Sequence, residues 1–265
     1  LPPVVTGPRS SIGSMAMADQ QLRDQILRRA AADDDLGARA RLVVSAAWHD
    51  LPADAPLTAA TEWVDAQVEL LERHHAAAST APDADDVERT CAAMRSAASG
   101  QTDAERVADA LSADRIQFLE TSLEFRDRHG TQPCPVCAAS ALDDEWVGRA
   151  RAALTTEKDA ASALRVARSA AHRARQALSA LVRAVQAPPA EDAGLPEIVA
   201  ARVAHQSFTT LPTDDDTALA DHVAGALPGL SAAYGALGTA AAAELVAARE
   251  VQAWLQGLPF PREQT

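Results

Sequence analysis

The residue types that build β-sheets are scarce in this chain of 265 residues. Aromatic residues make up 3 % of it, and there are only 12 glycines. Because strands are rich in β-branched and aromatic residues, this composition argues against a β-sandwich, a barrel or a Rossmann-type sheet. Alanine, the strongest helix former, is abundant instead, with 63 residues or about 24 % of the chain. The composition therefore predicts an all-α protein with a core of small residues.

Positive charge and long apolar runs are also lacking. The formal net charge is −13 at pH 7, which argues against a general coat for nucleic acid, since phosphate contacts need a cationic surface. No uninterrupted apolar run approaches the roughly 20 residues of a membrane span, and residues 1–17 do not resemble a signal peptide. Three cysteines, an odd number, do not make a disulfide framework. We therefore expect a cytoplasmic protein with reduced cysteines and no membrane partner.

Helical periodicity divides the chain into four expected segments. Residues 1–17 are rich in Gly, Pro and Ser and are expected to be a disordered or vector-derived leader. Residues 18–102 are expected to form the N-terminal part of a helical body, with the C-terminal part in residues 187–265. Between them, residues 103–186 are expected to form an antiparallel helical hairpin.

Several helix ends follow from capping residues. A short helix is expected to end at Gly100, and a longer one to run from Asp103 to a C-terminal stop at Gly130. Beyond residue 213 two separate helices are expected, the second from about Leu230 to Leu255.

The segment from Trp146 to Gln186 has the most regular pattern of the chain. Read in sevens, its two seams are apolar at eleven of twelve positions, the exception being Glu157. One seam contains Ala150, Glu157, Leu164, Ala171, Leu178 and Val185, and the companion seam contains Trp146, Ala153, Ala160, Ala167, Ala174 and Leu181. This repeat is typical of a coiled coil, and its alanines indicate a close approach of the partner helix. A long helix in an ordinary bundle is the alternative interpretation.

A Cys-x-x-Cys turn lies between the two longest expected helices. Cys134 and Cys137 enclose Pro135 and Val136, a spacing that places two thiolates close enough to hold one tetrahedral zinc ion. Zinc takes four ligands, so two are missing. Cys91 lies on an apolar helical face and is expected in the core, and His129 in the last turn of a helix is expected to offset the helix dipole.

A second copy of the same turn can supply the missing ligands. One zinc ion would then be held by four cysteines across the two-fold axis of a homodimer. Structural zinc contributes on the order of 10–16 kcal/mol in small peptides, so one shared ion can hold a small interface together. Two alternatives stay open: a thiol-responsive regulator in which Cys134 and Cys137 form a reversible disulfide, and a zinc site within one chain that uses His129 or Cys91.

A Cys-Pro-Val-Cys turn at the apex of an antiparallel coiled coil resembles the zinc hook of SMC-like ATPases of DNA repair and genome defence. The resemblance covers roughly residues 103–186 and is strongest from Arg128 to Cys137 and at the following Leu142 and Asp143. In that family, the hook cysteines join two molecules through one zinc ion, and the ATPase head is assembled from the two chain ends. The resemblance implies that Cys134 and Cys137 bind zinc and that Pro135 shapes the turn.

One residue departs from a related pattern. Many zinc knuckles have glycine directly after the second cysteine, whereas this chain has Ala138, which weighs against a generic zinc ribbon.

The resemblance implies a module that tethers two copies of an SMC-like ATPase acting on DNA in repair or phage defence. DNA would be reached through the parent ATPase. A phosphate-binding loop needs Gly-x4-Gly-Lys-Ser/Thr, but the only lysine, Lys158, follows Glu157 inside an expected helix. This chain alone is therefore not expected to hydrolyse nucleotide.

Two other sets of polar residues are candidates for a metal site and a DNA-binding surface. Glu72 and His75 form one Glu-x-x-His pair, whereas di-iron bundles use two, so these residues are expected on a solvated face. Between Trp146 and Gln186 eight cations stand against two acids, a local charge of +6. We expect these cations to pair with acids of the preceding helix, such as Asp114, Glu120, Glu124 and Asp127. A DNA-facing arm is the alternative, although no aromatic residues interleave for base stacking.

Overall fold

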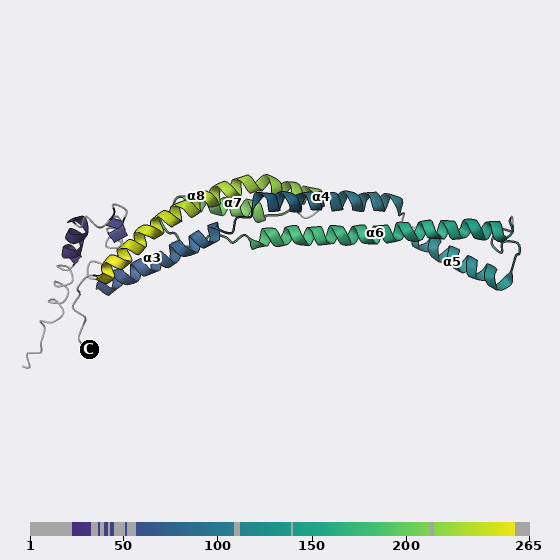
Figure 1. Cartoon of the computed structure of the whole chain (residues 1–265), viewed down its shortest axis with the longest axis horizontal. Helices are drawn as coiled ribbons and strands as arrows, with labels where there is room; N and C mark the ends of the chain where they lie inside the picture. The colour runs from purple at the N-terminus through teal and green to yellow at the C-terminus, as the bar shows by residue number, and fades with distance from the viewer. Residues whose placement is uncertain are drawn as a thin grey trace, which may run out of the picture. The chain divides into compact units, whose positions relative to one another are not determined.

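The computed structural model describes residues 23–32, 37, 40–41, 43–44, 51, 57–108, 112–138, 140–212 and 215–257. Its principal helices in chain order are α3 (Leu57–Ala78), α4 (Ala84–Val107), α5 (Ser112–His129), α6 (Asp144–Ala184), α7 (Glu197–Thr209) and α8 (Asp216–Gly257), as Figure 1 shows. The described residues contain one isolated antiparallel bridge, between Pro133 and Ala141, and no longer strand. The predicted all-α class is confirmed. The expected leader of residues 1–17 lies outside the described residues.

The chain folds into two compact units. The first unit contains residues 1–81, 185–207 and 228–265, and the second contains residues 82–184 and 208–227. The second unit therefore begins at Pro82 and includes all of α4, whereas the expected hairpin segment began at residue 103.

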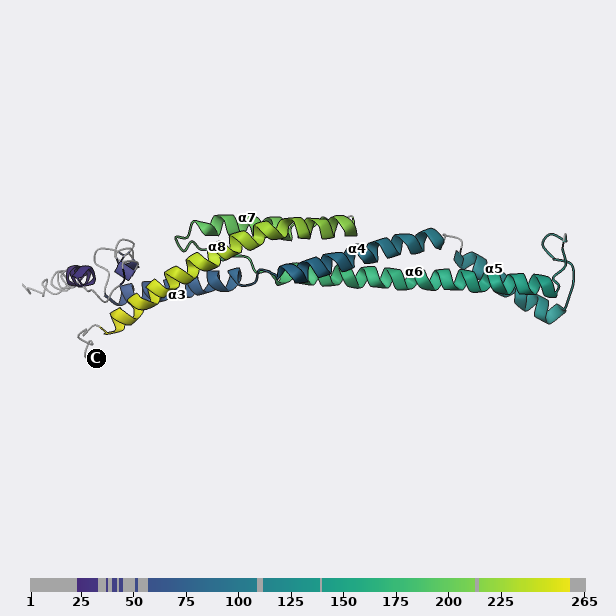
Figure 2. The same ribbon diagram turned by 45° about the horizontal axis from the view of Figure 1, so that its top comes forward.

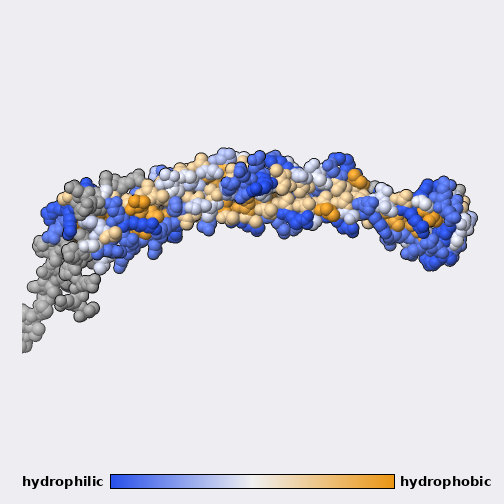
Figure 3. Space-filling view, in the orientation of Figure 1, coloured by the Kyte–Doolittle hydropathy of each residue, from blue (hydrophilic) through white to orange (hydrophobic). Residues whose placement is uncertain are grey.

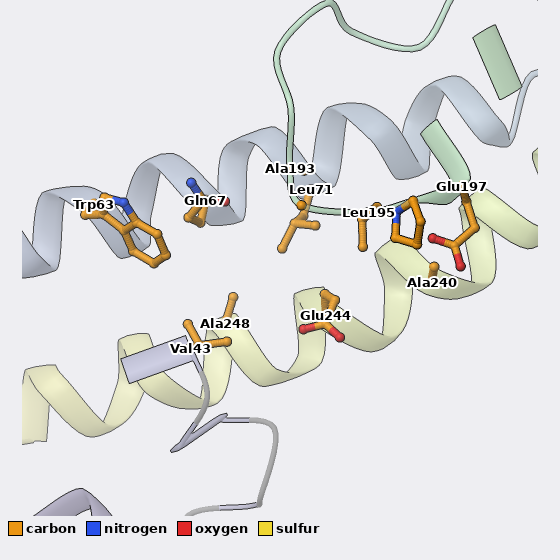
Figure 4. A pocket seen from close by; sticks show the side chains of 12 residues that line it. Val43, Trp63, Gln67, Leu71, Ala193, Leu195, Glu197, Ala240, Glu244 and Ala248 are labelled. Carbon is orange, nitrogen blue, oxygen red and sulfur yellow. The ribbon is translucent and has the colours of Figure 1, made fainter. Parts of the chain in front are cut away.

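In the first unit, one face of α3 is buried at Ala60, Val64, Val68 and Leu71. The spacing of these residues confirms the helical periodicity of that segment. Figure 4 shows α3 and α8 facing each other across a cavity of about 420 Å³, with apolar walls that include Trp63 and Leu71. The carboxylates of Glu197 and Glu244 face the space between the helices.

In the second unit, α4 and α5 lie one after the other along α6 and run antiparallel to it (Figures 1 and 2). The α4 helix starts after Asp83, whose side chain accepts hydrogen bonds from the amides of Asp85 and Asp86. The predicted helix end at Gly100 and helix start at Asp103 are wrong, because α4 continues through both to Val107. Packing of α4 against α6 outweighs the cost of about 1 kcal/mol for a glycine inside a helix.

The buried stripe of α6 follows the first of the two predicted seams. Its Ala150, Ala171 and Leu178 are buried, and Val185 just beyond the helix is buried as well. The companion seam is only partly right, because Ala153 is exposed, and Val147 and Val182 from the neighbouring row are buried instead.

Glu157, the polar residue of the first seam, is paired with the start of α5. The Ser112 hydroxyl donates to its carboxylate at 2.7 Å, and the Arg115 guanidinium lies 2.9 Å from the other carboxylate oxygen. A carboxylate at the first turn of a helix also interacts favourably with the helix dipole. Glu157 therefore fixes where α5 begins against α6.

The two helices predicted beyond residue 213 form the single helix α8, which continues through Pro228. Proline inside a helix removes a hydrogen bond and costs about 3 kcal/mol. The buried residues Val223, Leu227, Leu230 and Tyr234 keep one continuous helical stripe on both sides of Pro228. Burial of this stripe offsets the cost of the proline.

Length and composition set α8 apart from the other described helices. It is long and apolar enough to cross a membrane, although no such run is uninterrupted in the sequence. In its most apolar window, 33 % of the residues are buried. A core helix made of small residues passes the same test, so this property alone is weak evidence for a membrane span.

Candidate metal centre

The cysteine turn lies in the connection between α5 and α6, whose two sides meet at the isolated bridge between Pro133 and Ala141. Gly130 ends α5 in the left-handed conformation, with φ of 75°, as its predicted role as a C-terminal stop requires. After it, the amide of Cys134 donates to the Ser140 carbonyl at 2.8 Å, and that of Leu142 to the Gln132 carbonyl at 2.8 Å. These bonds hold the two sides of the connection together and present the turn between them.

The turn itself closes through the residue after the second cysteine. The Ala138 amide donates to the Cys134 carbonyl at 2.9 Å. Ala138 has φ of 53°, a left-handed conformation that glycine adopts easily and alanine only at a cost of roughly 1–2 kcal/mol. The backbone therefore adopts the conformation that favours glycine at this position of a knuckle, so the alanine does not argue against a metal-binding turn.

The sulfur of Cys134 lies in a cluster of hydrogen-bond donors. The backbone amides of Cys137 and Val136, together with the Cys137 thiol, lower the pKa of Cys134 below its ordinary value. Hydrogen bonds to a thiolate favour the charged form, which is the form that binds metal. The local backbone therefore favours the thiolate form of Cys134.

The two cysteines of the turn are free and accessible. Both are free thiols, Cys134 half-buried and Cys137 exposed. Over the part of the chain that the structure describes, no three or more His, Cys, Asp or Glu side chains gather into a metal-binding group. Two soft sulfur donors fit half of a tetrahedral zinc site, and two further donors are needed to complete it.

The other two sequence candidates lie elsewhere. The His129 ring packs against Phe125 in a tilted arrangement, with 4.7 Å between the ring centroids. Cys91 is 0 % exposed on α4, and burial raises the pKa of its thiol, which confirms the prediction of a core residue. Neither residue forms a ligand group with the cysteine turn.

Glu72 and His75 are both occupied by contacts within the first unit. Glu72 accepts from Arg249 at 2.7 Å, and the His75 ring lies 3.2 Å from the Gly238 carbonyl. Both side chains therefore lie on the exposed face of α3, as expected, and each contacts a residue of α8.

Several cations of α6 pair with acids: one pairs with Glu120, an expected partner on the preceding helix, and others pair with acids of α4, α8 and α6 itself. Lys158 pairs with Glu120 of α5 at 2.6 Å, and Arg168 pairs with Glu105 of α4 at 3.4 Å. Arg175 also pairs, with Asp216, and Arg149 pairs with Glu145 on its own helix. Such exposed pairs contribute little stability, but they neutralise much of the local positive charge.

Sequence reasoning missed an apolar groove that adjoins the cysteine turn. It has a volume of about 280 Å³, and Cys134 itself forms part of its wall. Phe118 and Phe125, seven residues apart on α5, line this groove, and Phe118 is 60 % exposed. The signal was present in the spacing of these aromatic residues, which places both on the side of α5 that continues into the turn.

Comparison with models of protein families, with curated proteins and with solved structures finds no match to this chain.

Proposed function

We propose that this chain is a zinc-mediated homodimerisation module. Cys134 and Cys137 of two copies share one zinc ion, so that each copy supplies half of a Cys₄ site. The observation that carries the proposal is the turn itself. Two accessible thiols are held together by backbone hydrogen bonds, and the described part of the chain offers no ligands to complete a site within one copy.

The surrounding helices suit a tether. The Arg126 side chain pairs with Asp144, which joins the end of α5 to the start of α6 just below the turn. Asp143 caps α6 by accepting a hydrogen bond from the Trp146 amide at 2.8 Å. The antiparallel α5 and α6 act in this proposal as a coiled-coil hairpin that presents the cysteines as a zinc hook at its tip.

The parent protein proposed for this module is an SMC-like ATPase that acts on DNA in repair or phage defence. This assignment depends on the resemblance of residues 103–186 to the zinc hook of that family. In this proposal, nucleotide hydrolysis belongs to the parent ATPase, because this chain has no Gly-x4-Gly-Lys motif. The parent ATPase also makes the DNA contacts. The expected location is the cytoplasm.

Sedimentation equilibrium of the full chain tests the proposal. With zinc present the chain sediments as a dimer, and a chelator in excess converts it to monomers. The double variant C134S/C137S stays monomeric with zinc, whereas C91S dimerises normally as a matched cysteine control. A dimer that persists in chelator, or in C134S/C137S, contradicts the proposal.

A thiol-responsive regulator is the second candidate, because the Cys137 thiol hydrogen-bonds to Cys134. It predicts that protein purified without reductant contains a metal-free disulfide between these residues. Mass spectrometry after alkylation of free thiols distinguishes the two proposals.

A further inference from the structure

The apolar groove beside the turn is built from two helices of the second unit and the turn between them. Phe118 and Phe125 come from α5, Trp146 from the start of α6, and Pro135 and Val136 from the turn. Figure 3 shows apolar surface at the α5 end of this unit, surrounded by hydrophilic residues. Apolar patches with a polar border mark interaction sites in soluble proteins.

The edges of this groove are exposed to an unusual degree for large apolar side chains. Val136 is 77 % exposed, and Phe118 is 60 % exposed. Leu142, which also lines the groove, is in contrast almost fully buried and forms its floor. The groove therefore has a packed base and an unfilled mouth.

The position of Cys134 decides what can cover this mouth. Cys134 is both a proposed zinc ligand and part of the groove wall. In a tetrahedral site with Zn–S distances of about 2.3 Å, the four sulfurs lie within about 4 Å of one another. A second copy that shares the zinc therefore brings its own Pro135 and Val136 next to the groove of the first copy.

We propose that the groove is the docking site for the tip of a second copy of this chain in the zinc-bridged dimer. The inference rests on the proposed function. The contact is isologous, so each copy offers the same groove and the same exposed Val136 to the other. Aromatic side chains in such a pocket supply binding energy and exclude water from the metal site.

Zinc and groove have separate roles in this arrangement. The metal holds the two turns together at one point, and the apolar contact fixes their orientation. The groove has a volume of only about 280 Å³, so in this proposal it adds to the zinc contact and does not sustain a dimer alone. Removing the groove contact should weaken the dimer without removing the zinc ligands.

Two substitutions in the zinc-loaded full chain test the inference. V136D introduces a charge into the groove mouth, and V166D introduces the same charge on α6 at a valine that is 64 % exposed. The dimer dissociation constant, measured by sedimentation, should rise by about tenfold or more for V136D, the equivalent of about 1.4 kcal/mol. It should stay within about twofold for the V166D control, which by the same relation is about 0.4 kcal/mol.

A third substitution separates the groove from the turn. F118S alters α5 and leaves every residue of the cysteine turn in place, and it should weaken the dimer in the same direction as V136D. Zinc content at saturating protein concentration should remain one ion per two chains in all three variants. Unchanged dissociation constants for both V136D and F118S overturn the groove inference while the zinc dimer stands. A wild-type chain with no zinc-dependent dimer overturns both proposals.

Discussion

Glu157 offers a direct test of how α5 is fixed against α6. It occupies a seam position that the heptad pattern reserves for apolar residues, and it is paired with Ser112 and Arg115 at the start of α5. Ser112 is 5 % exposed, so its hydroxyl depends on this carboxylate as a partner. We predict that Glu157→Ala destabilises the docking of α5 although the substitution agrees better with the heptad pattern.

The magnitude follows from the two contacts. A hydrogen bond to a charged group contributes about 1.5–3 kcal/mol, and an unpartnered buried hydroxyl costs about 1 kcal/mol or more. The Glu157 and Arg115 side chains are 22 % and 45 % exposed, which reduces the value of the ion pair through solvent screening. The docking of α5 is therefore expected to lose about 1–2 kcal/mol of free energy. This loss corresponds to a 5- to 30-fold larger equilibrium constant for local opening of α5.

Amide hydrogen exchange across α5 measures this opening. A double-mutant cycle with Ser112→Ala isolates the pair: Ser112→Ala in the Glu157→Ala background should change the exchange rate much less than in the wild-type chain. An exchange rate in Glu157→Ala equal to that of the wild type, or additive effects in the cycle, would show that the contact between Glu157 and Ser112 does not fix α5 against α6.

Three further predictions concern single residues. Ala138→Gly should stabilise the cysteine turn by about 0.5–1 kcal/mol, because the left-handed conformation no longer carries strain, and Ala141→Gly should not; competition with a chromophoric chelator measures this as tighter zinc binding. Tyr234, the only tyrosine, has its pKa raised to about 12 by burial, so the stability that it contributes is present below its unfolded pKa of about 10 and is lost as pH rises towards 12. Tyrosinate absorbance should therefore titrate in one step near pH 12, and a step near 10 in the folded chain contradicts the burial. His74 has its pKa lowered by burial, so its contribution is present above the unfolded pKa of about 6.5 and is lost as pH falls below it; urea unfolding of the first unit should become easier between about pH 7 and 5.

The helices that the sequence located best are those with a strict repeat. The seam of Ala150, Ala171 and Leu178 follows directly from a seven-residue period, and Gly130 ends α5 as a C-terminal glycine should. Both features depend on local pattern, which the sequence contains in full.

The errors arise where packing outweighs local preference. Gly100 and Pro228 belong to residue types that end helices in isolation, yet Gly100 lies inside α4 and Pro228 lies inside α8. The α4 helix packs against α6, and the buried face of α8 continues on both sides of Pro228. The local sequence pattern does not show how much surface a helix will bury against a helix that is distant in the sequence.

The candidate site is likewise predictable from the sequence only in part. Cys134 and Cys137 are recognisable from their spacing alone. The left-handed backbone of Ala138 and the groove lined by Phe118 are not, because both depend on how the connection folds back onto α5. Alanine rarely adopts a left-handed backbone conformation, so the sequence does not indicate this conformation at residue 138.

The ratio of zinc ions to protein chains tests directly whether the cysteine turns of two copies share one ion. Native mass spectrometry of the zinc-loaded chain, purified under reducing conditions, resolves the number of chains and ions in each species. A shared site predicts a dimer that carries one zinc ion, and a C134S/C137S variant that is monomeric and metal-free. A monomer with one zinc ion, or a dimer with two, would contradict a site shared between copies.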